Sequence, residues 1–461
     1  MRPLISAVVL AVLVGGCGGS AASGAASLTP VAAATPSPVA STPVASSSPS
    51  GAFSSATPAP SSASPMATPE GWLPALGLPT IAVPPAALHR MAGNGGLATW
   101  GPRTYAVDEP PRSGHASLIV TNLESSTSAR SSIPLLAGET TVPPDGLRDP
   151  ATIVAADAHW LAVVVWKRLG PTGGPIAVPC SGHEEQPVAW RLLIAPLDPA
   201  TGQLAGTFRV LDHGTNTHHF ALPGQGEGCG GPRTPRVSLD GDQIAYTVEE
   251  TAAATPFATR IEVRALPAGS LVRSVERPQE VLFVALSGGN VAFTESQDAS
   301  TVGNPRWSVG LSTAAHPVPT VVVSGAQDPG YVAPPLIALD GDLLAWQLLN
   351  HTEEGIWTEG LGSSPEQVVP TDLTCRLGGA TAGWVGMGCY PTGYQTDSFM
   401  PYQPVVWSTA TGLRQLAGLP SLIVGAAPSL GGGWLSADGG TPMQDSGTLY
   451  GLSLAGLATA P

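Results

Sequence analysis

The sequence predicts an all-β protein, a seven-bladed β-propeller with four-stranded blades, preceded by a disordered linker. Proline and glycine interrupt the chain about every 10 to 15 residues, and the apolar segments between them are short and rich in Val, Ile and Leu, as in strands joined by tight turns. A turn motif recurs along the chain at spacings of about 40 to 80 residues. The first 70 residues also differ sharply in composition from the rest.

The N-terminal segment has the features of an export signal. Arg2 precedes the apolar run Leu4–Val14, which is too short for a membrane span of about 20 residues. The run leads into Val-Gly-Gly-Cys17, which resembles a bacterial lipobox, although Gly15 stands where Ala or Ser is commoner. The resemblance implies a lipoprotein signal peptide at 1–16, a lipidated Cys17, and an anchor on the extracytoplasmic face of the cell membrane. An ordinary secretory signal that contains a cysteine is the alternative.

Residues 17–70 are rich in Ser, Ala, Pro and Thr and contain almost no large apolar side chain. Such a segment buries too little apolar surface to offset the entropy lost on ordering its backbone. We therefore expect a disordered stalk, extended by its interspersed prolines, between the anchor and a propeller domain at 71–461.

Charge excludes some classes of partner. The formal net charge is −14, and Lys167 is the single lysine of the chain. Nucleic acid binding needs clustered Lys and Arg, so a nucleic acid partner is not expected, and neither is direct electrostatic adhesion to anionic lipid. We expect membrane contact through the lipid anchor only, and a monomer.

The repeat consists of a leucine, a glycine-containing turn, a spacer, an aliphatic residue, alanine and an aromatic residue. Three copies are strong: Leu239–Tyr246, Leu286–Phe293 and Leu339–Trp346. Four weaker copies complete a set of seven: Gly95–Trp100, Asp157–Ala162, Gly378–Trp384 and Gly431–Leu435. The small position of the repeat falls near residues 98, 162, 245, 292, 345, 382 and 435. The motif resembles TolB-type and WD40-like bacterial propeller repeats, and an irregular pair of β-sandwiches is the alternative.

The last unit lacks room for its fourth strand before the chain ends. A ring closed by strand exchange needs that strand from elsewhere, and we expect Pro79–Val83 to supply it, because pairing the chain ends hides two sheet edges.

Four cysteines remain if Cys17 carries lipid, and an even number in an exported chain suggests two disulfides. Three pairings are possible, and we favour Cys180–Cys229 and Cys375–Cys389. The order of the repeat places all four on one face of the propeller, where each favoured pair joins a loop between blades to a neighbouring long loop. The long connections at 167–187, 212–233 and 389–404 are expected on the same face.

Two clusters are candidate sites. Tyr390, Tyr394 and Tyr402 lie in the 389–404 connection and suit contact with a protein or a glycan, or else pack this connection onto its own blade. The second cluster offers ligands for zinc or copper, or is a solvated histidine-rich loop. It comprises His183, Asp212, His213, His218 and His219. The carboxylates of Asp240, Asp242, Asp340 and Asp342 are expected to be turn residues rather than calcium ligands.

No Gly-x-Ser-x-Gly or His-Glu-x-x-His motif is present, and no cofactor is expected. The sequence therefore favours a ligand-binding or protein-binding scaffold over catalysis. An envelope protein or a glycan is the expected partner, and the TolB resemblance implies a role within an envelope assembly. The alternative is an extracytoplasmic hydrolase or metal-dependent enzyme with its site on the loop-rich face.

Overall fold

A computed structural model describes the second of two compact units, residues 67–461, from residue 75 onward. The described residues are 75–92, 98–110, 113–141, 154–170, 183–221, 235–249, 258–296, 306–326, 336–348, 355–361, 363–392, 402–419, 428–441 and 444–457. The predicted signal peptide, the stalk, Cys17, Cys180, Cys229 and Tyr394 lie outside them. Within the described residues, no helix is long and apolar enough to cross a membrane.

The first four blades follow one another along the chain. Blade one contains β3 (Ala98–Trp100), β4 (Arg103–Asp108), β5 (Ala116–Asn122) and β6 (Thr127–Ile133). Blade two contains β7 (Val154–Ala156), β8 (Trp160–Arg168), β9 (His183–Pro196) and β10 (Arg209–Ala221). Blade three contains β11 (Val237–Asp240), β12 (Gln243–Glu249), β13 (Thr259–Ala265) and β14 (Ser270–Arg277). Blade four contains β15 (Glu280–Ser287), β16 (Asn290–Ser296), β17 (Arg306–Ser312) and β18 (Thr320–Ala326).

The remaining blades complete the set of seven. Blade five contains β19 (Leu336–Asp340), β20 (Leu343–Leu348), β21 (Gly355–Gly360) and β22 (Glu366–Gln367). Blade six contains β23 (Leu373–Thr381), β24 (Trp384–Pro391), β25 (Gln403–Ser408), β26 (Gly412–Ala417) and β1 (Thr80–Ala82). Blade seven contains β27 (Ser429–Gly431), β28 (Trp434–Thr441), β29 (Gln444–Ser453) and β2 (Leu88–Ala92). Short 3₁₀ helices occupy Pro85–Ala87 and Leu454–Gly456.

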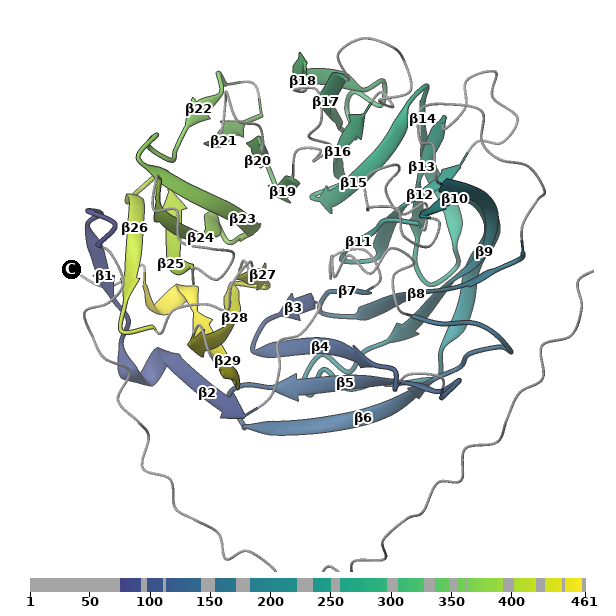
Figure 1. Ribbon diagram of the computed structural model, residues 1–461, viewed down its shortest axis with the longest axis horizontal. Helices are drawn as coiled ribbons and strands as arrows, with labels where there is room; N and C mark the ends of the chain where they lie inside the picture. Colours follow the sequence, from purple (N-terminus) through teal and green to yellow (C-terminus); the bar gives the residue numbers. More distant parts are fainter. Residues whose placement is uncertain are drawn as a thin grey trace, which may run out of the picture. The chain divides into compact units, whose positions relative to one another are not determined.

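The seven sheets form a closed ring (Figure 1). The first strand of each blade is innermost, and these strands contact one another from blade to blade, including β27 against β3 where the ring closes. The prediction of a seven-bladed, nearly all-β propeller is therefore confirmed.

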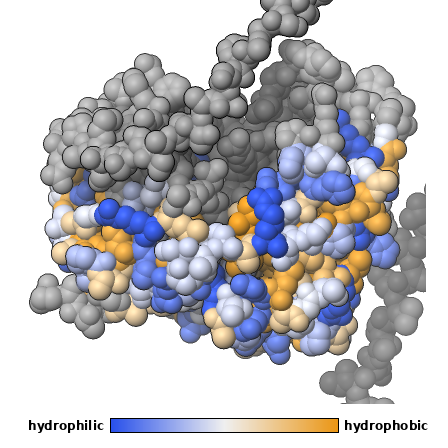
Figure 2. Space-filling model, turned by 90° about the horizontal axis from the view of Figure 1, so that it is seen from below, coloured by the Kyte–Doolittle hydropathy of each residue, from blue (hydrophilic) through white to orange (hydrophobic). Residues whose placement is uncertain are grey.

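Burial explains why these segments are strands in this order. The second strand β8 is buried from Leu161 to Trp166, because neighbouring blades cover both faces of its sheet. The outer strand β6 is largely exposed and ends in the buried Ile133. Polar and apolar residues interleave over the side of the ring seen in Figure 2. Blade packing, rather than the outer surface, thus accounts for the apolar runs in the sequence.

The strong copies of the repeat occupy equivalent positions in three consecutive blades. Each spans the last two residues of the first strand, a two-residue turn and the start of the second strand. The predicted small residue is the third of the second strand and is fully buried in all three: Ala245, Ala292 and Ala345. Ala162 holds the same position in blade two.

In blades one, six and seven, the small position predicted from the weak copies does not coincide with the structural equivalent of Ala245. Residue 98 lies in the first strand of blade one, and residue 382 lies in a turn of blade six. The positions equivalent to Ala245 in these blades are instead Tyr105, Gly386 and Ser436. Gly386 and Ser436 are small and buried like the alanine, but Tyr105 is large, so a search for alanine followed by an aromatic residue did not find these positions.

The ring is closed by strand exchange, but not by the predicted segment. The outer strand of blade seven is β2, which pairs antiparallel with β29. The predicted segment forms β1 instead, which adds to blade six as a fifth strand, parallel to β26 (Figure 1). His89 and Arg90 interrupt the apolar residues of β2, which is tolerated on an outer strand and conceals it from a search for apolar runs.

The two faces of the ring are defined by the connections that reach them. The lower face carries the turns between first and second strands and between third and fourth strands. The upper face carries the connections between second and third strands and those between blades. Many upper-face connections fall outside the described residues.

A chain of hydrogen bonds joins the lower-face turns of successive blades, from blade three through blade seven to blade one. In each link, a turn glycine N–H donates to the last residue of the preceding blade's first strand: Gly288 to Asp240 Oδ2 (2.6 Å), Gly341 to Ser287 Oγ (2.8 Å), Gly383 to Asp340 Oδ2 (2.7 Å), Gly433 to Thr381 Oγ1 (2.9 Å) and Gly101 to Gly431 O (3.1 Å). Asp242 and Asp342 lie in the turns, as predicted, whereas Asp240 and Asp340 end the strands before them and link neighbouring blades.

Candidate binding face

A pair of tyrosines lies at the upper end of blade six. Tyr390 is near the end of β24, and Tyr402 directly precedes β25. Their ring centroids are 5.2 Å apart with an interplanar angle of 72°, an edge-to-face contact. Both side chains are half-buried. Two of the three predicted contact residues are therefore brought together at the ends of adjacent strands.

A disulfide fixes the strand that carries Tyr390. Cys375 on β23 pairs in register with Cys389 on β24, and the two are bonded with their Cα atoms 4.0 Å apart. Both are buried. The predicted pairing is confirmed, but the reason for it was wrong, because the bond joins two strands of one blade rather than a loop to a loop.

A small cavity lies beside this disulfide, between blades five and six. It has a volume of about 40 Å³ and is lined by Cys375, Thr374, Gln347 and five other residues. Gln347 joins the two blades, because its side-chain oxygen accepts a hydrogen bond from the Leu377 N–H at 2.7 Å and its amide donates to the Cys375 carbonyl. At this volume the cavity can hold a few water molecules at most, far less than the about 300 Å³ of a typical ligand site, so it is not a candidate site.

The upper-face connections are shorter than the sequence predicted. Strand β9 begins at His183 and β10 continues to Ala221, so parts of the predicted connections 167–187 and 212–233 are strands. The two strands pair continuously from Asp212 to Ala221, and each satisfies the backbone hydrogen bonds of the other. The polar sequence of this hairpin was mistaken for a loop, because it lacks the apolar alternation of a half-buried strand.

Asp212, one of the predicted metal ligands, forms a hydrogen bond between blades two and three. Its Oδ2 accepts a hydrogen bond from the Tyr246 hydroxyl at 2.6 Å, and the same hydroxyl lies 2.9 Å from Glu262 Oε2. Burial raises the pKa of the Tyr246 hydroxyl, and the hydrogen bond to Asp212 raises it further. Arg264 and Arg260 pair with Glu262 at 2.6 and 3.0 Å. Asp212 therefore belongs to a network that joins two blades.

The strand register places His213 far from the other predicted histidine ligands, His183, His218 and His219. His213 is exposed, and it lies five residues from His218 along the same extended strand, on the order of 16 Å away. At the far end of the hairpin, His219 pairs with Glu185, and Ala221 pairs with His183. The side chains of His183, His218 and His219 lie outside the described residues. Where side chains are described, no group of three metal-binding residues occurs.

Other buried carboxylates also join elements of the ring. Glu295 accepts two hydrogen bonds from Arg277, at 2.8 and 2.7 Å. Glu139 pairs with Arg191 at 2.5 Å. Burial alone would raise the pKa of Glu139, but the Arg191 guanidinium holds it below its usual value. Both carboxylates are thus paired with arginines that link parts of the ring.

The polar residues that join blades one and two were not among the predicted site residues. Arg103, 9% exposed, donates from Nη2 to the carbonyl oxygens of Pro199 and Ala200 in the β9–β10 turn. The fully buried Tyr105 lies nearby, and burial raises its pKa to about 12. No signal in the sequence marked Arg103, because its strand also contains Thr104 and Asp108.

The fold and the blade-six rim define a seven-bladed β-propeller with a braced aromatic pair on one face. No protein-family model and no curated protein sequence matches the chain. Its fold is similar to that of an acylaminoacyl peptidase in complex with Z-Gly-Gly-Phe-chloromethyl ketone, with a TM-score of 0.43, 9% identity, and coverage of 76% of this chain and 49% of that one. This chain thus spans about half the length of that peptidase.

Two further structures share the fold at similar levels. The β-propeller domain of the trilobed protease from Pyrococcus furiosus has a TM-score of 0.42 and 8% identity, covering 76% of this chain and 91% of its own. An oligogalacturonate lyase in complex with manganese has a TM-score of 0.38 and 12% identity, covering 78% and 84%. These likenesses concern the fold alone, which the sheet topology defines.

Proposed function

We propose that this chain is a membrane-anchored, extracytoplasmic β-propeller lipoprotein that binds an envelope protein or glycan through the upper rim of blade six. The TolB-like character of its repeat and its lipobox-like N-terminus support the location. The observation that carries the binding role is the half-exposed Tyr390–Tyr402 pair, set on two strand ends and braced by a disulfide.

The chemistry of this rim suits recognition. Tyrosine combines a large apolar ring with a hydroxyl and loses little side-chain entropy on binding, so it is enriched where interfaces gain most affinity. The edge-to-face contact and the Cys375–Cys389 bond hold the rings before a partner arrives, which lowers the cost of ordering them.

A double substitution tests the binding role. We expect Tyr390→Ala with Tyr402→Ala to reduce cross-linking of the full-length protein to envelope partners at least tenfold. Because Tyr402 also packs against the core between blades six and seven, the melting temperature should fall by several degrees while the propeller stays folded. Tyr450→Ala, which removes a half-exposed tyrosine from blade seven, is the matched control. Unchanged cross-linking in the double variant would show that this rim is not the contact surface.

Location is tested separately. We expect Cys17→Ser to release the protein from the membrane fraction while leaving the propeller folded, because acylation at Cys17 is the proposed anchor. Retention of the variant in membranes would contradict lipid anchoring.

One observation favours a metal-dependent enzyme as the second candidate. The β9–β10 register places His219 opposite Glu185, two residues from His183. Stoichiometric zinc or copper in the purified protein, lost in His183→Ala with His219→Ala, would support it. A protein that retains no metal after loading would exclude it.

A further inference from the structure

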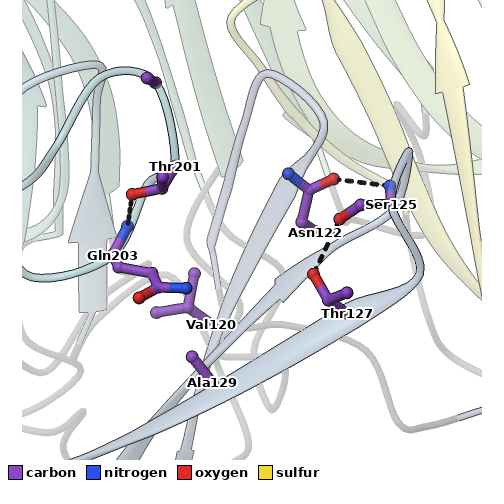
Figure 3. Close-up of a pocket in the computed structure, with 8 residues that line it drawn as sticks. Val120, Asn122, Ser125, Thr127, Ala129, Thr201 and Gln203 are labelled. Atoms are coloured by element: carbon purple, nitrogen blue, oxygen red, sulfur yellow. Dashed lines mark hydrogen bonds between the residues drawn. The ribbon is translucent and has the colours of Figure 1, made fainter.

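A polar pocket lies on the lower face between blades one and two (Figure 3). Its volume is about 170 Å³. One wall is the β5–β6 hairpin of blade one, with Asn122, Ser125 and Thr127. The other is the β9–β10 turn of blade two, with Thr201 and Gln203. This pocket is at the opposite end of the blades from the tyrosine pair.

The turn that forms the second wall is held in place from within the ring. Asp198 Oδ1 accepts the Ala200 N–H at 2.8 Å, and the Gly202 N–H donates to the Asp198 carbonyl. Arg103 of blade one holds the carbonyls of Pro199 and Ala200. A Cβ on Gly202 would lie 2.0 Å from the Arg103 side chain, so only glycine permits this approach. The two walls are therefore tied together beneath the pocket.

The hairpin wall is equally ordered. Asn122 Oδ1 accepts the Ser125 N–H at 3.1 Å, which turns the Asn122 amide nitrogen toward the opposite wall (Figure 3). The Ser125 and Thr127 hydroxyls are 2.7 Å apart, and on the facing wall Thr201 Oγ1 accepts the Gln203 N–H at 3.3 Å. Preorganised polar groups of this kind lose little entropy when a ligand binds.

The lining determines the class of ligand. None of the lining residues is charged, so a charged ligand would give up hydration without gaining an opposite charge. Amide and hydroxyl side chains offer both donors and acceptors, which complement ligand hydroxyls. Val120 and Ala129 add apolar surface for the C–H groups of a ring. The volume is below the about 300 Å³ of sites for drug-sized molecules, which fits a single ring.

We propose that this pocket binds one ring of a neutral saccharide, and that the side chains of Asn122, Thr127 and Gln203 form hydrogen bonds with its hydroxyl groups. The site is separate from the blade-six rim, and the proposal does not depend on the function of that rim.

The test is a titration of the full-length protein with methyl glucoside, N-acetylglucosamine and glucuronate, followed by ligand-observed NMR and calorimetry. We expect saturable binding of a neutral sugar with a dissociation constant below about 10 mM and at least tenfold weaker binding of glucuronate. Gln203→Ala and Thr127→Val should each raise the dissociation constant of the neutral sugar about tenfold. Ser132→Ala, an exposed position on the same outer strand β6, should leave it unchanged.

Three outcomes would overturn the proposal. They are no saturable binding of either neutral sugar, equal affinity for glucuronate, and binding that survives Gln203→Ala combined with Thr127→Val. Melting curves of both variants distinguish a lost contact from a lost fold.

Discussion

Blades three to five, the regular arc, are held together differently from blades six, seven, one and two, the closing arc. In the regular arc, each blade repeats a two-residue glycine turn followed by a fully buried alanine. In the closing arc, the equivalent positions in blades six, seven and one carry Gly386, Ser436 and Tyr105. Gly386 and Ser436 are small and buried as well, whereas Tyr105 is large. The closing arc also has covalent and strand-exchange ties that the regular arc lacks among the described residues, a disulfide and two exchanged strands, and it has the buried Arg103 with its carbonyl partners.

The difference shows two ways to hold a blade. A small buried residue lets neighbouring sheets approach, and its contribution is spread over many weak contacts. A cross-tie concentrates its contribution in a few residues. Single changes in the closing arc should therefore have large and identifiable effects.

The largest effect is expected from removing both exchanged strands. Deletion of residues 75–92 should lower the free energy of unfolding by about 5 kcal/mol or more, because Leu76 and Ile81 lose their packing at about 1.5 to 3 kcal/mol per buried side chain and two sheet edges become exposed. Thermal melting measures the loss. A chain that begins at residue 75 is the control and should melt like the parent. Equal melting of the two would show that the ring does not need its exchanged strands.

A smaller effect is expected from Asp157, in the β7–β8 turn of blade two. This carboxyl is 1% exposed, accepts the His159 and Trp160 N–H groups at 2.7 Å on Oδ1, and has no hydrogen-bond partner on Oδ2. Burial raises its pKa to about 6, so the folded state binds a proton that the unfolded state has released. Stability should therefore fall as pH rises from about 4 to about 6 and then level off.

Asp157→Asn should remove this slope while keeping the Oδ1 acceptor. At pH 7.5 the variant should be more stable than the parent by up to about 3 kcal/mol, and at pH 4 the two should agree. Denaturant unfolding at a series of pH values measures the free energy of unfolding of both proteins. Parallel curves for parent and variant would contradict a raised pKa.

The smallest of the three effects is expected from the disulfide. Cys375→Ala with Cys389→Ala should cost about 2 kcal/mol, the lower end of the usual range, because the bond closes a short segment whose strands remain paired. Reduction of the parent should lower its melting temperature by a similar amount. An unchanged melting temperature would mean that the β23–β24 ladder alone holds blade six.

The regular arc was predictable because its pattern is local. Each copy places its turn, alanine and aromatic residue within eight consecutive positions, as in Leu239–Tyr246. The closing arc was predictable only in outline. Strand exchange followed from the short last unit, but β2 could not be identified, since an outer strand tolerates His89 and Arg90.

The candidate sites show the same limit. Tyr390, Tyr402 and the Cys375–Cys389 bond are neighbours in a hairpin, so sequence proximity revealed them. The pocket between blades one and two joins segments about 80 residues apart, and its walls are tied by a buried arginine. No spacing rule predicts that contact, because it depends on how two blades meet.

The parallel attachment of β1 has a mechanical consequence. Tension on the chain upstream of Ala75 would first meet Leu76, which is inserted into the core between blades five and six. It would then load the β1–β26 ladder along its length, in shear, with its bonds resisting together rather than parting one at a time. The attachment of β1 to blade six would therefore bear the force first. Strand β2, which closes the ring, would be loaded only after β1 had detached.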